Sequence, residues 1–199
     1  MDFPFSNASL ELAAAVFGLI YVFLEIRASI WLWPIGIITP LLFIYISYTG
    51  GVYGNMAVNI YYFLACIYGW IQWFKHRKEG PVETQVKVLS GRTLSIVIAA
   101  TAFIAGGLYP IFEYVTFNSS PLLDAVATSA SIVGMWLLAH KYLENWYAWI
   151  LSNILYTYIF LSLSYTIMGI FFFIYTIMAV IGLRNWKKMK RTQAASATA

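Results

Sequence analysis

The stretch ENWYAWILSN combines two tryptophans with an asparagine at spacings of three and four residues. Trp146, Trp149 and Asn153 therefore share one face of a helix. Two flat indole rings and an amide that both donates and accepts suit a flat heteroaromatic ring with a polar edge. A stacked cation would gain about 0.5–2 kcal/mol from each ring. The alternatives are anchoring of the tryptophans at a membrane interface and a helix–helix hydrogen bond from Asn153.

Other polar and aromatic side chains lie inside apolar runs of the sequence. A polar group at membrane depth is costly and indicates a function. Packing, interface anchoring and helix contacts are again the alternatives. The residues that we add to the predicted substrate site are Asn59, Tyr62, Gln72, Trp70 and Tyr175.

Patterns for catalysis and metal binding are missing from the sequence. His76 and His140 have no ligand spacing and no third partner, so we predict no metal site. The single cysteine, Cys66, excludes an internal disulfide and is interpreted as a small packing residue. The sequence has no nucleophile elbow, phosphate loop or pair of carboxylates at membrane depth. We therefore predict no cofactor and no enzymatic activity, and facilitated diffusion rather than an acid-driven pump.

The elements that must position these side chains are membrane-spanning helices. The 199 residues are 61% hydrophobic and only 10% charged, whereas soluble domains have about 25% charged residues. Runs of about 18 apolar residues are typical of spans, and runs apolar on all faces favour helices over barrel strands. The sequence predicts an all-α integral membrane protein with seven spans, at about 10–26, 31–49, 56–74, 93–114, 121–140, 146–163 and 166–184.

The basic residues predict how the chain is oriented in the membrane. All 12 lysines and arginines follow odd-numbered spans, so seven spans place them on one side. Because cytoplasmic loops carry an excess of Lys and Arg, we predict an N-terminus outside and a C-terminus in the cytoplasm. The basic tail is interpreted as a topology signal, and no nucleic acid partner is expected.

Two stretches of the chain, 18–78 and 134–191, resemble each other. Each has a charged break, a pair of tryptophans (Trp31/Trp33 and Trp146/Trp149) and a closing glycine, tryptophan and basic cluster. Two like-oriented units of three spans need one span between them, which predicts a 3+1+3 parallel pseudo-repeat, as in transporters that hold substrate between their halves. The predicted parts are 1–92, a linker span at 93–114, 115–191, and a disordered cytoplasmic tail at 192–199.

The segments YLENWYAWILSN, IYGWIQW and GVYGNMAVNIYYF resemble the Pnu family of bacterial vitamin transporters, over about residues 15–188. The resemblance implies seven spans arranged as in SWEET sugar transporters, in the bacterial inner membrane. It implies facilitated diffusion of an unphosphorylated vitamin, which a cytoplasmic vitamin kinase then traps. It places Trp146, Trp149 and Asn153 in the substrate site, and by analogy it suggests a homotrimer.

Two parts of the resemblance indicate different vitamins. The tryptophan–asparagine motif resembles the nicotinamide riboside branch of the family. Asn59 replaces a glutamine common in that branch, and LEIRASIWLW and NIYYF resemble the thiamine branch. We expect uptake of nicotinamide riboside, with thiamine and then riboflavin as alternatives. A membrane scaffold or receptor that transports nothing is the alternative of another class.

Overall fold

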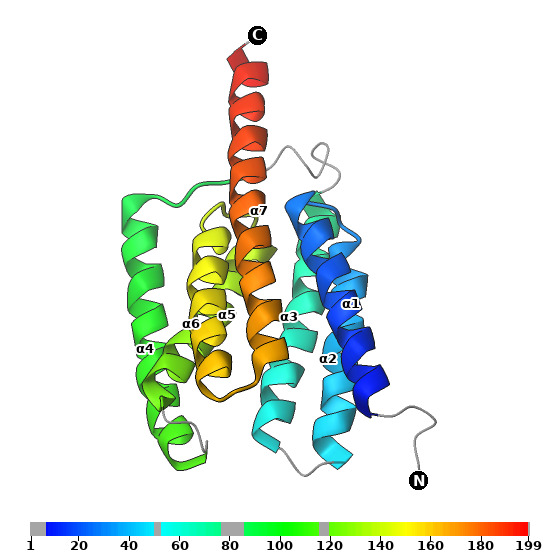
Figure 1. Cartoon of the computed structure of the whole chain (residues 1–199). Coiled ribbons are helices and arrows are strands. Elements are labelled where there is room, and N and C mark those ends of the chain that lie inside the picture. The colour runs from blue at the N-terminus through cyan, green and yellow to red at the C-terminus, as the bar shows by residue number, and fades with distance from the viewer. Residues whose placement is uncertain (1–6, 50–52, 77–85, 116–119, 199) are drawn as a thin grey trace. The chain divides into compact units, whose positions relative to one another are not determined.

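A computed structural model describes residues 7–49, 53–76, 86–115 and 120–198 of the chain (Figure 1). These residues form seven α-helices, at the places that the sequence predicts. The helices are α1 (Asn7–Ile26), α2 (Leu32–Thr49), α3 (Tyr53–His76), α4 (Gly91–Val115), α5 (Pro121–Ala139), α6 (Asn145–Ser162) and α7 (Thr166–Thr198).

Three of the described helices are both long and apolar enough to cross a membrane, judged by length and composition: Gly91–Tyr114, Pro121–Ala139 and Thr166–Ser196. Val16–Ile26 and Leu32–Tyr48 are shorter apolar helices. The helices α3 and α6 contain all the predicted substrate-site residues except Tyr175, which lies on α7.

The C-terminal tail corrects one expectation. Residues 192–198 continue α7 as a helix, whereas the sequence predicts disorder from residue 192. Ala, Lys, Arg, Met and Gln, which are good helix formers, dominate the end of α7. At 33 residues the helix is about 50 Å long, against a hydrocarbon core of about 30 Å.

The contacts divide the chain into two compact units, 1–82 and 83–199. In the first unit α2 packs against α1 and α3; in the second α5 packs against α4 and α6, and α6 against α7. The helix α4 therefore packs as a member of the second unit. The division into 1–92, 93–114 and 115–191 and the parallel 3+1+3 arrangement stay predictions.

The α1–α2 corner of the first unit and the α5–α6 corner of the second have the same backbone geometry. Adding 113 to a residue number in the first gives its counterpart in the second (28 to 141, for example). Ala28 and Lys141 have φ of 50° and 60°. The Ser29 N–H donates to Leu24 O at 3.0 Å, and the Tyr142 N–H donates to Leu137 O at 2.9 Å. Both helices thus end in a Schellman motif, which turns the chain into the next helix.

A tryptophan after each corner is enclosed by the last helix of its unit, α3 in the first and α7 in the second. Trp33 meets Trp73 edge-on, with ring centroids 5.4 Å apart, and Trp146 meets Trp186 in the same way at 5.7 Å. A methyl group on Gly69 or Gly182, one turn before each partner, would overlap the ring of Trp33 or Trp146. The sequence comparison pairs Trp31/Trp33 with Trp146/Trp149, but the structure pairs Trp33 with Trp146. Trp31 is 68% exposed.

Candidate functional site

Trp146 lies in the interior of the second unit rather than on an open surface. Its side chain is 1% exposed, between Gly182 and Trp186 of α7. Its indole nitrogen is buried and has no hydrogen-bond partner among the described residues. In this conformation Trp146 packs α6 against α7, and its ring offers no free face for stacking.

Trp149 is half-buried, one turn further along α6. Its ring lies against α5, where a methyl group on Gly134 would be 3.5 Å from Trp149 Cε2. The Trp149 indole N–H is also buried without a partner in the described part of the chain. A buried donor without a partner costs about 1–3 kcal/mol. A polar atom of a bound substrate would satisfy it.

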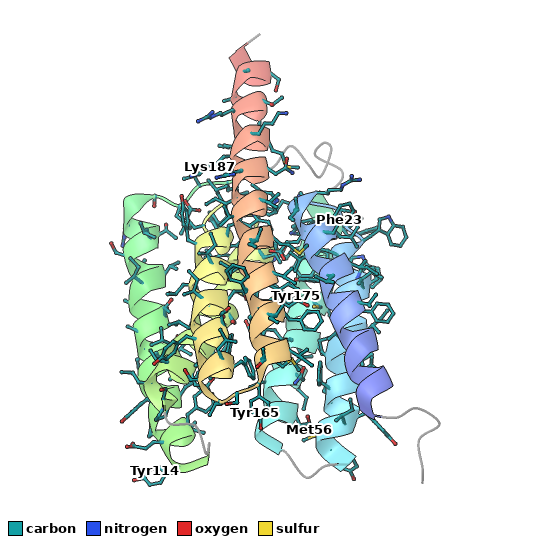
Figure 2. The ribbon with its side chains drawn as sticks, in the orientation of Figure 1. Phe23, Met56, Tyr114, Tyr165, Tyr175 and Lys187 are labelled. Atoms are coloured by element: carbon teal, nitrogen blue, oxygen red, sulfur yellow. The ribbon has the colours of Figure 1, made fainter. Side chains whose placement is uncertain are left out.

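Asn153 and Tyr175 lie level with each other on α6 and α7. Asn153 is seven residues beyond Trp146, and Tyr175 is seven residues before Gly182, the residue that contacts Trp146. The contact of Tyr156 with Phe172, at 5.0 Å between ring centroids, continues the same antiparallel register. Figure 2 shows Tyr175 between Tyr165 and Lys187 along α7. Both side chains are half-buried, so they offer an amide and a phenol at one depth.

Polar side chains of α5 and α6 form hydrogen bonds with each other where the two helices pack. Ser131 Oγ lies 2.5 Å from Ser152 Oγ, and Thr128 Oγ1 lies 2.8 Å from the Tyr156 hydroxyl. The backbone carbonyl of Asn153 accepts from Thr157 Oγ1 at 2.7 Å. The Asn153 side-chain amide, in contrast, forms no hydrogen bond with another described residue. The helix contacts that explain the serines and Thr128 therefore leave the Asn153 amide available to a ligand.

The first unit holds the other predicted site residues, all on α3. Asn59 is buried at 9% exposure, and Tyr62 is half-buried beside Tyr61, with ring centroids 5.5 Å apart. Gln72 donates to the Tyr68 hydroxyl at 2.7 Å, and Trp70 is 39% exposed. The spacing of 113 residues makes Tyr62 the counterpart of Tyr175. The structure therefore places Trp149, Asn153 and Tyr175 in one unit, on the neighbouring helices α6 and α7, and Asn59 and Tyr62 on α3 of the other.

Sequence reasoning does not identify one aromatic residue that matters for the first unit. The Tyr21 ring of α1 lies 2.6 Å from the place of a methyl group on Gly36, close to Cys66 Sγ, which is 3.1 Å from the same point. Cys66 is 1% exposed, as expected of a packing residue. Tyr21 and Gly36 are the counterparts of Gly134 and Trp149. At this pair of positions each unit thus has a ring against a glycine, but the ring comes from α1 in the first unit and from α6 in the second. Because the residue types are exchanged, the sequence comparison does not reveal the match.

No group of three or more His, Cys, Asp or Glu side chains that could hold a metal ion occurs within the described ranges. The predicted site residues of the second unit carry an indole N–H at Trp149, an amide at Asn153 and a phenol at Tyr175. Groups of these kinds suit an uncharged or cationic aromatic molecule, by stacking and hydrogen bonding. They include no nucleophile–base pair for a covalent step.

Comparison with known proteins identifies the family. The family model described as nicotinamide mononucleotide transporter matches residues 8–188. The chain belongs to this family. Because the family and its relatives are transporters, the predictions of the Pnu resemblance and of no enzymatic activity are confirmed.

Relatives of this transporter family differ in the substrate that they are named for. The chain is 26% identical over 180 residues to the riboflavin/roseoflavin transporter RibM of Streptomyces davaonensis, covering 88% of this chain and 83% of that one. It is 23% identical over 212 residues to the nicotinamide riboside transporter PnuC of Escherichia coli, covering 94% and 89%. It is 31% identical over 147 residues to PnuC of Neisseria mucosa, covering 71% and 56%.

A solved structure supports the all-helical membrane fold. The chain is similar to the crystal structure of the vitamin B3 transporter PnuC, with a TM-score of 0.75 and 26% sequence identity. The similarity covers 94% of this chain and 84% of that one.

Proposed function

We propose that this protein takes up an unphosphorylated B vitamin or vitamin precursor, and that its substrate is nicotinamide riboside. The observation that carries the proposal is that Trp149, Asn153 and Tyr175 are half-buried on the neighbouring helices α6 and α7, in a chain of the transporter family. Nicotinamide riboside has a flat cationic ring, a carboxamide and sugar hydroxyls. The ring suits stacking on Trp149, and the carboxamide and hydroxyls suit the Asn153 amide and the Trp149 N–H.

Transport would proceed by facilitated diffusion with alternating access. We also place Asn59, Tyr62, Gln72 and Trp70 on the substrate path, because they are polar or aromatic side chains inside apolar runs of the sequence. A cytoplasmic kinase would trap the vitamin by phosphorylation, which makes uptake directional without an ion gradient. The N-terminus would lie outside the bacterial inner membrane and the C-terminus inside. A homotrimer is the assembly that we propose by analogy.

Uptake by liposomes tests the proposed function. The purified protein should equilibrate labelled nicotinamide riboside without ATP or an ion gradient. Asn153→Leu, which removes the available amide, should lower uptake at least about tenfold, since a polar group left unpaired by a lost hydrogen bond costs about 1–3 kcal/mol. Tyr158→Phe also loses a polar group on α6, but Tyr158 is 58% exposed, and this control should transport normally.

The same liposomes distinguish the alternatives. Labelled thiamine or riboflavin, supplied separately, should enter more slowly than nicotinamide riboside. Riboflavin is a specific alternative because of the similarity to RibM, and Asn59 is the feature that favours thiamine. Faster entry of either vitamin would replace the proposed substrate. No flux of any of the three would contradict transport of these vitamins and favour the scaffold or receptor.

A further inference from the structure

The segment before α4, residues 86–90, lies against the α5–α6 corner; we call it the strap. Its centre forms an isolated parallel bridge: the Lys87 N–H donates to Lys141 O at 2.9 Å, and the Leu143 N–H donates to Lys87 O at 2.8 Å. Val86, at the start of the strap, is 2% exposed. The strap therefore packs against the corner and is hydrogen-bonded to it.

A hydrogen bond to the Glu144 side chain holds the C-terminal end of the strap. The Leu89 N–H donates to Glu144 Oε1 at 3.1 Å, across 55 residues of sequence. Glu144 is the N-cap residue of α6, but its side chain makes no capping bond to its own helix. Its carboxylate accepts a hydrogen bond from the strap instead. The second oxygen, Oε2, is buried and has no hydrogen-bond partner among the described residues.

The corner next to Glu144 is itself held in one geometry. Lys141 has a left-handed φ of 60°, and Asn145 Nδ2 donates to Tyr142 O at 2.6 Å. The strap binds the Lys141 carbonyl and the Leu143 amide, which lie in the turn between the two helices. The strap therefore fixes the position and direction with which α6 begins. Along that helix, Trp149 and Asn153 follow within three turns.

We propose that Glu144 is a positioning residue for substrate binding: by accepting the Leu89 N–H, it clamps the strap onto the corner and sets how α6 presents Trp149 and Asn153. This inference rests on the proposed function. Loss of the Glu144 acceptor would leave the Leu89 N–H without a hydrogen-bond partner and would loosen the contact between the strap and the corner. Small displacements of a supporting group weaken a binding site even when every contacting residue is present.

Paired variants test the clamp in the full chain. Glu144→Ala removes the acceptor, and Leu89→Pro removes the donor. Each should raise the Kd for nicotinamide riboside, measured by tryptophan fluorescence, at least about tenfold. The double variant should bind no more weakly than the weaker single variant, because both changes break one interaction. Glu144→Gln keeps an acceptor oxygen and should stay within about twofold of the original Kd.

Glu113→Ala is the matched control, since Glu113 is an exposed acidic residue on α4. Its Kd should not change. A lower melting temperature for Glu144→Ala with an unchanged Kd would show that Glu144 only stabilises the fold, and would overturn the proposal. If the unaltered protein neither binds nor transports any of the three vitamins, the proposed function itself fails, and with it the role in binding.

Hydrogen exchange tests the clamp without any ligand. The Leu89 amide should exchange slowly in the unaltered protein and fast in Glu144→Ala, while Glu144→Gln restores most of the protection. Equally fast exchange of the Leu89 amide in the unaltered protein and in Glu144→Ala would contradict the clamp directly.

Discussion

At the scale of single residues, the two tryptophans of the α6 motif differ in their surroundings. Both follow from the sequence as members of one helical face, together with Asn153. Which indole is enclosed depends on Gly182 and Trp186, about 35 to 40 positions away in the chain. Spacing within one helix carries no information about that neighbour. The sequence therefore predicts the composition of the site but not the separate roles of Trp146 and Trp149.

This difference predicts that the same substitution mainly lowers stability at Trp146 and mainly lowers substrate affinity at Trp149. Trp146→Ala should lower the free energy of unfolding by about 3–5 kcal/mol, because it empties a closed space between α6 and α7. Trp149→Ala should instead raise the Kd for nicotinamide riboside, with a smaller loss of stability, since its half-buried ring is not enclosed in this way. Thermal unfolding and fluorescence titration of both variants measure the two effects. A larger loss of stability for Trp149→Ala would contradict the assignment.

At the scale of elements, the repeated corner explains how one helical pair is built twice from different sequences. The left-handed residue is Ala28 in one corner and Lys141 in the other. Neither residue type signals a Schellman motif as glycine would. The glycines that reveal the repeat lie on the last helix of each unit, where they leave room for the rings of Trp33 and Trp146. The existence of a repeat could be predicted from the basic clusters, but its register could not.

The surroundings of the glycines predict how a Gly→Ala substitution changes stability, according to what the added methyl group would contact. Gly69→Ala and Gly182→Ala place a methyl group in a tryptophan ring, and should destabilise the fold by about 1–3 kcal/mol through overpacking. Gly106→Ala on α4 meets nothing within 4 Å, and should be neutral or stabilise by up to about 1 kcal/mol. Melting temperatures in one detergent compare the three variants. Equal tolerance at all three positions would rule out a close contact.

At the scale of the whole molecule, composition and charge predict seven helices and their places. The apolar runs are long, and each break carries a charge or a turn residue, as at Arg27 and at Ser164, whose φ is 63°. The length of α7 is missed because the basic, polar sequence at its end has no apolar periodicity, although its residues favour helix. The packing of α4 on α5 is a property of the folded unit, which a run of apolar residues does not indicate.

The odd number of helices, with the basic cluster at the end of α7, predicts opposite locations for the two termini. If every helix crosses the bilayer, the excess of Lys and Arg places the C-terminus in the cytoplasm. A fluorescent protein fused after Ala199 should then fold and fluoresce in bacteria, and alkaline phosphatase at the same place should be inactive. Fusions at Ser164, between α6 and α7, should show the reverse pattern. Active phosphatase after Ala199 would mean that the orientation is the reverse of the predicted one. Equal results at both positions would mean that α7 does not cross the membrane.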